Sequence, residues 1–133
     1  MKALVVDDNE SLRKLFQIFL QGMGFDTDGA PNGNIAFKMI KSSDYDLILS
    51  DMDMPVVNGM ELYKLINMYS PQLTSRMVFA TGNEFDEGYR TFFNKISCPV
   101  LSKPVMLDDL KEIVRPIKEK VIKNKPHRSK TYN

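Results

Sequence analysis

The chain has 133 residues, of which 43% are hydrophobic and 26% charged, and this composition suits one compact domain with its own hydrophobic core. No apolar run is long enough for a membrane-spanning helix, and the acidic residues after the first run argue against a signal peptide, so we expect a cytoplasmic protein. The single cysteine excludes an internal disulfide and a metal site built from paired cysteines.

The net charge of +1 is unevenly distributed along the chain. Residues 118–133 hold five lysines and one arginine against one glutamate, a net charge of +5, which leaves −4 for residues 1–117. A basic end of this kind is usually a solvated helix end or tail, and a contact with nucleic acid or a partner is the rarer alternative. We therefore expect a domain over residues 1–122 and a basic tail, or the start of a linker, over residues 123–133.

Short apolar runs alternate with stretches of helical periodicity, which is typical of strand–helix units around a parallel sheet. Strands are predicted at residues 3–6, 25–30, 46–50, 76–80 and 99–102. The run at 3–6 is apolar on both faces, as in a central parallel strand. Acidic residues alternate through 25–30, which indicates an edge strand.

Three helices are predicted between the first four strands. The first ends at Gly22 or Gly24. Its apolar stripe consists of Leu12, Leu15, Phe16, Phe19 and Leu20. A weaker second helix covers residues 34–41, and the third has Asn58 as its N-cap and ends where Ser70 precedes Pro71.

Two further helices follow. The first of them is weakened by Gly88, and its aromatic residues are expected to lie mostly in the core, with one or two exposed for a partner as the alternative. These aromatic residues are Phe85, Tyr89, Phe92 and Phe93. The last helix begins near residue 107 or 108 and includes Pro116, which would cost about 3 kcal/mol inside a continuous helix. It therefore either kinks at Pro116 or ends at Arg115, and we expect fraying from Lys123 onward.

Five strand–helix units predict a three-layer α/β sandwich, a doubly wound parallel sheet with helices on both faces. In the flavodoxin-like strand order 2-1-3-4-5, ligands bind where the order reverses, beside the C-terminal ends of strands 1 and 3. Polar residues follow four of the predicted strands. They are Asp7 and Asp8 after the first strand, Asp51 after the third, Thr81 after the fourth and Lys103 after the fifth.

Three carboxylates at one edge of the sheet repel one another unless a cation lies among them. Oxygen ligands suit Mg²⁺, and Mg²⁺ with Lys103 would also neutralise an incoming phosphoryl group. A carboxylate oxygen could attack phosphorus directly, with the Thr81 hydroxyl as a further contact to the phosphoryl oxygens. Asp51 is the best candidate nucleophile, because it stands alone while Asp7 and Asp8 are adjacent and can share the metal.

Four sequence motifs in this order carry a resemblance to a known family. They are VVDDN at 5–9, DMDMPVVNG at 51–59, ATG at 80–82 and SKP at 102–104. Together they resemble the CheY-like receiver domain of bacterial two-component response regulators, from about residue 2 to residue 121. The resemblance implies that Asp51 accepts a phosphoryl group from a histidine kinase or a phosphotransfer protein, with self-catalysed transfer and hydrolysis as the only chemistry.

The resemblance also implies a role for each residue around Asp51. Asp8, Asp51 and the backbone carbonyl of Asp53 would bind Mg²⁺ directly, and Asp7 would act mostly through water. Lys103, set by a cis peptide bond to Pro104, would pair with the phosphoryl oxygens. Thr81 would move toward the phosphate and change a surface formed by helix 4, strand 5 and helix 5. That surface would bind a downstream protein. The chain would be a monomer or a phosphorylation-dependent dimer, and neither a membrane nor nucleic acid is an expected partner.

The sequence departs from the family at three places. Val100 stands where an aromatic switch residue is common, and Gly82 should loosen the loop after Thr81. Asp53 and Asn83 flank the route of the hydrolytic water in such proteins, so an acid at 53 is expected to affect the lifetime of the acyl phosphate.

Two other functions stay open at this point. Asp51-Met52-Asp53 imitates the DxD element of haloacid-dehalogenase-like phosphatases, although those proteins place DxD on the first strand and this chain does not. A receiver-like interaction module that is never phosphorylated is the other. For single residues, Asp7 or Asp8 could merely cap a helix, Thr81 could be a turn residue, and Lys103 could be solvated.

Overall fold

The structure is a computed structural model that describes residues 1–124. Its five strands are β1 (Lys2–Val6), β2 (Asp26–Ala30), β3 (Leu47–Asp51), β4 (Met77–Thr81) and β5 (Val100–Ser102). They form one parallel sheet in the order β2-β1-β3-β4-β5. The predicted α/β sandwich with strand order 2-1-3-4-5 is therefore confirmed.

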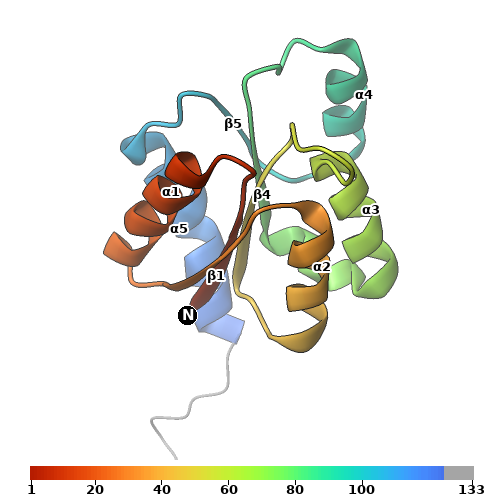
Figure 1. Cartoon of the computed structure of the whole chain (residues 1–133). Coiled ribbons are helices and arrows are strands. Elements are labelled where there is room, and N and C mark those ends of the chain that lie inside the picture. The colour runs from red at the N-terminus through yellow and green to blue at the C-terminus, as the bar shows by residue number, and fades with distance from the viewer. Residues whose placement is uncertain (125–133) are drawn as a thin grey trace, which may run out of the picture.

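Helices cover both faces of this sheet (Figure 1). They are α1 (Glu10–Gly22), α2 (Gly33–Ser42), α3 (Gly59–Tyr69), α4 (Glu87–Lys95) and α5 (Leu107–Asn124), with a short 3-10 helix, η1 (Pro71–Arg76), after α3. Phe16 of α1 and Val114 of α5 belong to the core on one face, whereas Ile40 of α2, Ile66 of α3 and Phe92 of α4 belong to the core on the other. Within residues 1–124 no helix combines the length and hydrophobicity that a bilayer crossing requires.

The central strands are buried on both faces, as their continuous apolar sequences predict. All five residues of β3 and of β4 are buried. In β2, by contrast, Asp26 is exposed and the next three residues are half-buried. β2 lies at the edge of the sheet, so the prediction of an edge strand from its alternating acids is confirmed.

Asparagine side chains fix where α1 and α3 begin. Asn9 Oδ1 accepts a hydrogen bond from the Leu12 N–H at 3.0 Å, so α1 starts directly after β1 and its two acids. Asn58 and Glu61 form a reciprocal capping box at α3, with bonds of 2.9 and 3.1 Å. The predicted N-cap at Asn58 is therefore confirmed, and such caps stabilise a helix by about 1 kcal/mol.

The predicted aromatic helix starts later than its aromatic residues suggested. Asp86 caps α4, because its Oδ1 accepts a hydrogen bond from the Tyr89 N–H at 3.1 Å. Phe85 therefore lies in the loop before the helix and is 82% exposed, so its placement in the helix was wrong. In α1 the apolar stripe is narrower than predicted, since Leu15 is exposed while Phe16 and Leu20 are buried.

The last helix continues through Pro116 as one segment to Asn124. Of the two predicted alternatives, an end at Arg115 is therefore wrong. The domain boundary at residue 122 stays a prediction. Val114 and Val121, on either side of the proline, are both buried, and this packing offsets the lost backbone hydrogen bond. Most of the predicted basic tail, residues 125–133, lies outside the described part of the chain.

A strained turn lies between β3 and α3. The Val57 N–H donates to the Pro55 carbonyl oxygen at 2.8 Å, which closes a three-residue turn around Val56. Val56 has a φ of 69°, a region that β-branched residues rarely adopt. Val56 is 82% exposed, so packing contacts of its side chain offset little of the strain energy.

Replacing Val56 by glycine should stabilise the protein. Val56→Gly is expected to raise the free energy of unfolding by about 0.5–1 kcal/mol, because the backbone strain is lost while glycine's extra freedom in the unfolded chain offsets part of the gain. Urea denaturation would measure it. Met68→Gly is the matched control, because Met68 is 84% exposed but lies within α3, and it should cost up to about 1 kcal/mol. Destabilisation by both variants would contradict the strain at Val56.

Candidate functional site

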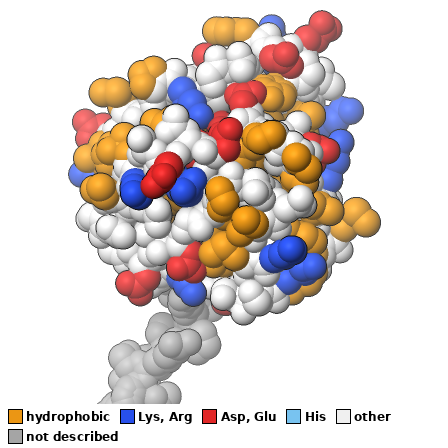
Figure 2. Space-filling view, in the orientation of Figure 1, with side chains coloured by type: hydrophobic (Ala, Val, Ile, Leu, Met, Phe, Trp, Pro, Cys, Tyr) orange, Lys and Arg blue, Asp and Glu red, His pale blue; other side chains and the backbone are white. Residues whose placement is uncertain are grey.

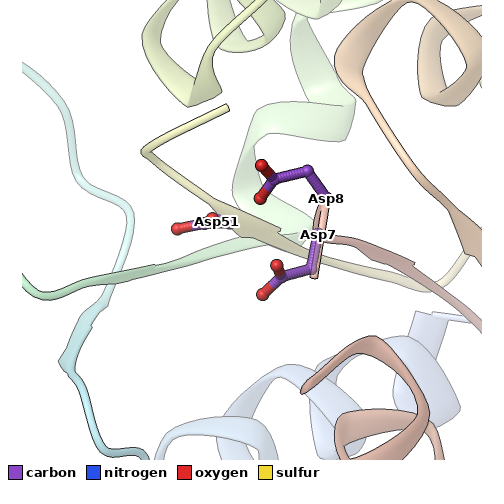
Figure 3. A group of neighbouring side chains, drawn as sticks. All are labelled: Asp7, Asp8 and Asp51. Atoms are coloured by element: carbon purple, nitrogen blue, oxygen red, sulfur yellow. The ribbon is translucent and has the colours of Figure 1, made fainter. Parts of the chain in front are cut away.

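Three carboxylates meet at the C-terminal ends of β1 and β3. Figure 3 shows Asp7 and Asp8, directly after β1, pointing toward Asp51 on β3. One carboxylate oxygen from each residue lies within 4.8 Å of the others. Asp51 is the last residue of β3 and pairs with Ala80 of β4, whereas the sequence predicted that the strand ends at Ser50. The position where the strand order reverses therefore holds the acids, as predicted for this topology.

Two of the three acids are almost completely buried. Asp7 is 1% exposed and Asp51 4%, while Asp8 is exposed to solvent. Asp7 Oδ1 accepts a hydrogen bond from the Asn9 N–H at 2.9 Å, but Asp7 Oδ2 is buried without a hydrogen-bond partner among the described residues. A buried carboxylate oxygen without a donor is the chemical environment that a hard cation fits. The donor set, oxygen from three carboxylates, also fits Mg²⁺.

Lys103 provides the positive charge closest to these acids. Its Nζ lies 3.0 Å from Asp51 Oδ1 and 3.7 Å from Asp7 Oδ2. The Lys103–Pro104 peptide bond is cis, and the Lys103 N–H donates to the Thr81 carbonyl oxygen at 2.9 Å. The Lys103 ammonium group therefore contacts the acids, which contradicts the alternative of a solvated lysine.

Burial and neighbouring charges shift the pKa values of Asp7, Asp51 and Lys103. Burial raises the pKa of the Asp51 and Asp7 carboxyls above their ordinary values, although Lys103 opposes the increase. The pKa of Lys103 is also raised, because its hydrogen bond and attraction to Asp51, and its attraction to Asp7, outweigh the effect of burial. One lysine cannot neutralise three carboxylates, so the site favours the binding of an additional cation.

The loop after β3 approaches the start of α3 very closely. A Cβ at Gly59 would lie 2.8 Å from the Asp51 carbonyl oxygen and 2.7 Å from Met52 Sδ, and the Gly59 N–H donates to the Met52 carbonyl oxygen at 3.1 Å. Glycine is required for this approach. Gly59 and the capping box of α3 thus fix the backbone that follows Asp51.

Thr81 and Asp53 form the other side of the site. Thr81, the last residue of β4, is fully buried, and its Oγ1 accepts a hydrogen bond from the Asn83 N–H at 2.9 Å. Its hydroxyl lies 3.4 Å from Asp53 Oδ2. Gly82 is exposed, with no atom within 4 Å of where a Cβ would be. The chain after Thr81 therefore has space that the chain after Asp51 lacks.

Tyr89 of α4 is the site residue that the sequence analysis missed. Its hydroxyl donates a hydrogen bond of 2.5 Å to Asp53 Oδ1. Burial raises the pKa of this phenol, and the hydrogen bond to Asp53 raises it further. The helical spacing of the aromatic residues indicated a core position for Tyr89. Nothing in that spacing shows that the hydroxyl reaches the Asp53 carboxylate in the loop after β3.

Comparison with protein families and with characterised proteins gives consistent results. A family model described as the response regulator receiver domain matches residues 3–115. The autoinducer 1 sensor kinase/phosphatase LuxN of Vibrio harveyi is 35% identical over 111 residues, which are 84% of this chain and 13% of that protein. The response regulator protein PilR of Pseudomonas aeruginosa is 34% identical over 113 residues, 85% of this chain and 25% of that protein. The chain thus spans a quarter or less of these relatives.

Solved structures match over nearly their whole length. The response regulator protein TrrA of Thermotoga maritima, crystallised in complex with Mg²⁺-BeF, is 30% identical with a TM-score of 0.75, covering 87% of this chain and 97% of that one. The chemotaxis protein CheY4 of Vibrio cholerae is 26% identical with a TM-score of 0.77, covering 87% and 97%.

Replacing Asp51 by asparagine should stabilise the chain in metal-free buffer at neutral pH. Asp51→Asn is expected to raise the free energy of unfolding by on the order of 1 kcal/mol, because the fold disfavours the ionised carboxyl, whose pKa it raises. A raised folded-state pKa contributes stability at low pH that is lost as the pH rises through that pKa. The gain should therefore be smaller at an acidic pH below this raised pKa, where the wild-type carboxyl is protonated and the charge that the fold disfavours is gone.

Urea denaturation at both pH values, with and without Mg²⁺, measures this effect. Added Mg²⁺ should stabilise the wild type more than Asp51→Asn, since a ligand that binds the folded state stabilises it. Asp26→Asn, at an exposed acid of β2, is the control and should change little. Equal destabilisation of Asp51→Asn at both pH values would contradict the electrostatic account.

Proposed function

The chain belongs to the response regulator receiver domain family, and from this premise we propose that Asp51 accepts a phosphoryl group from a phosphohistidine donor in a Mg²⁺-dependent reaction. Receiver domains are signalling modules of phosphorelays, and homologues of this chain occur in sensor kinases and response regulators. The observation that carries the proposal is the buried carboxylate of Asp51, 3.0 Å from Lys103 Nζ and within an acidic cluster suited to Mg²⁺.

The contacts of Asp51 leave one of its oxygens available as the nucleophile. Lys103 Nζ and the Asp53 N–H, at 3.2 Å, both contact Oδ1. Within residues 1–124 no hydrogen bond to Oδ2 is found, so Oδ2 would attack phosphorus. A P–O bond forms as the P–N bond of the donor breaks, and the leaving imidazole keeps the electron pair of the broken bond.

The surrounding residues would stabilise the negative charge on the phosphoryl oxygens. Asp8, Asp51 and the Asp53 backbone carbonyl would hold Mg²⁺, with Asp7 contributing through water, and the metal would neutralise charge on those oxygens. Lys103, already oriented toward Asp51 Oδ1, would pair with one phosphoryl oxygen. The Mg²⁺-BeF complex of TrrA, at 30% identity, supports the use of the metal in this chain.

The output would be a change in a protein-binding surface. Thr81 would turn its hydroxyl toward the phosphoryl group, and the surface of α4, β5 and α5 would change with it, because the ligand favours one arrangement over the other. The phosphodonor would be a histidine kinase or a phosphotransfer protein in the cytoplasm. A downstream protein would bind the altered surface, with the chain as a monomer or a phosphorylation-dependent dimer, and without nucleic acid or membrane as a partner. Beyond its own phosphorylation and dephosphorylation, the chain would catalyse no reaction.

The position of Asp53 argues against the phosphatase alternative. In that mechanism the second acid of the DxD element protonates the leaving group next to the first. Here both oxygens of Asp53 contact hydroxyl groups of other elements, Tyr89 of α4 and Thr81 of β4. The family model and the solved structures reported above also match receiver domains, not haloacid-dehalogenase-like phosphatases.

Phosphorylation of Asp51 can be tested by intact mass. Incubation with Mg²⁺ and acetyl phosphate should add one phosphoryl group to the wild type and to the control Asp26→Asn, and none to Asp51→Asn. Borohydride reduces an acyl phosphate to an alcohol, so peptide mapping after reduction should find residue 51 converted to homoserine. The expected loss is complete, because the side-chain amide of the variant offers no carboxylate nucleophile.

Three outcomes would contradict the proposal. A phospho-adduct that persists on Asp51→Asn, or homoserine at another position, would assign the nucleophile elsewhere. Many turnovers on a phosphate ester, abolished by Asp51→Asn, would instead support a phosphatase.

A further inference from the structure

We propose that Tyr89 is a positioning residue for phosphorylation: its hydroxyl holds the Asp53 carboxylate, so that Thr81 can leave Asp53 and turn its hydroxyl toward a phosphoryl group on Asp51. This inference rests on the function proposed above. It adds a role for α4 in the chemistry of the site, through a side chain that contacts neither the acidic cluster nor Lys103 in the described structure.

The hydroxyl of Tyr89 is held in place by the rest of α4. Tyr89 lies in the first turn of the helix, where Asp86 caps its N–H at 3.1 Å. Its ring centroid lies 6.3 Å from that of Phe93, which in turn lies 6.2 Å from Phe79 of β4. The ring is thus packed against the core that covers this face of the sheet. Because the ring is packed, the position of the Tyr89 hydroxyl depends on the position of α4.

Asp53 lies between two hydroxyl donors that hold it unequally. Tyr89 contacts Asp53 Oδ1 at 2.5 Å, a short hydrogen bond to an ionised acceptor, whereas Thr81 contacts Oδ2 at 3.4 Å. The two donors come from different elements, α4 and the end of β4. Because the bond to Tyr89 is short and the contact with Thr81 is long, Tyr89 is the main side-chain hydrogen-bond donor to this half-buried carboxylate.

The Thr81 hydroxyl has one hydrogen to donate. Its oxygen already accepts a hydrogen bond from the Asn83 N–H, so the hydrogen is shared between Asp53 and any phosphoryl oxygen near Asp51. Without Tyr89, Asp53 would depend on Thr81 as its side-chain donor. Turning Thr81 to a phosphoryl group would then leave the carboxylate unsatisfied, which carries a desolvation penalty.

Electrostatic repulsion between the Asp53 carboxylate and a phosphoryl group on Asp51 would also oppose phosphorylation if Tyr89 did not hold Asp53. In Figure 2 red acidic side chains extend from the strand ends toward the region of α4, so an anion at Asp51 enters negatively charged surroundings. Asp53 contributes to that field and also attracts Lys103. If the carboxylate were released from Tyr89, it could turn toward Lys103 and Thr81, the two groups that the phosphoryl oxygens would use.

A double-mutant cycle on beryllofluoride affinity tests the proposal. Beryllofluoride would be titrated at saturating Mg²⁺, and binding followed by the NMR signal of the Thr81 backbone amide. Tyr89→Phe keeps the ring and removes the hydroxyl, and it should weaken binding about three- to tenfold. Asp53→Ala should tighten binding, because it removes both the competing acceptor and a negative charge. The double variant should bind like Asp53→Ala, since the hydroxyl acts only through that carboxylate.

The controls separate this role from a structural one. Tyr69→Phe removes the hydroxyl of a half-exposed tyrosine of α3 that stacks edge-on against Phe37, and it should leave the affinity unchanged. A general loss of stability would weaken binding in both single variants, whereas the proposal requires effects of opposite sign.

Four outcomes would overturn the inference. Wild-type affinity in Tyr89→Phe would show that the hydroxyl is not used. A double variant as weak as Tyr89→Phe would show that it acts without Asp53. Undiminished binding of beryllofluoride to Asp51→Asn, or no binding to the wild type, would contradict the proposed function itself, and the inference with it.

Discussion

The burial of like charges at the C-terminal ends of β1 and β3 is the constraint on which the rest of the site depends. Asp7 and Asp51 are almost inaccessible to water, and Lys103 alone stands against three carboxylates. Such a cluster disfavours folding, so other parts of the molecule must stabilise it. The two apolar layers do so: Leu4, Val5, Ile48 and Leu49 on the strands that carry the acids are at most 1% exposed. A metal ion bound among these acids would offset unfavourable charge that the fold already holds.

The parallel topology explains how residues far apart in sequence reach this point. Each strand ends at the same edge of the sheet, and the crossover helices return the chain to the opposite edge before the next strand begins. Acids on two central strands therefore face the hydroxyl of a third and the lysine that follows a fourth. The hydrogen bond from the Lys103 N–H to Thr81 links the last two of these across β4 and β5.

The sequence predicted the features that depend on periodicity and on strand ends. Strand order, the edge position of β2, the Asn58 cap and the gathering of Asp7, Asp8, Asp51, Thr81 and Lys103 all follow from such local signals. The predictions from the sequence failed where long-range packing determines the local structure. Pro116 is tolerated because buried valines lie on both sides of it, and Phe85 leaves the helix because Asp86 caps it. The contact of Tyr89 with Asp53 joins residues 36 positions apart. A helical pattern shows which face of a helix is apolar, but not which distant residue a hydroxyl group on it contacts.

The two loops beside the acidic cluster differ in how tightly they are held. After Asp51, the close approach of Gly59 and the reciprocal cap of α3 leave the backbone little freedom. After Thr81, Gly82 faces open space and the next helix begins only at Glu87. A ligand that pulls on both sides would therefore displace mainly the second loop. The two sides of the site therefore differ in how tightly they are packed, and a displacement that began at Asp51 would pass mainly toward β4 and α4 rather than toward α2 and α3.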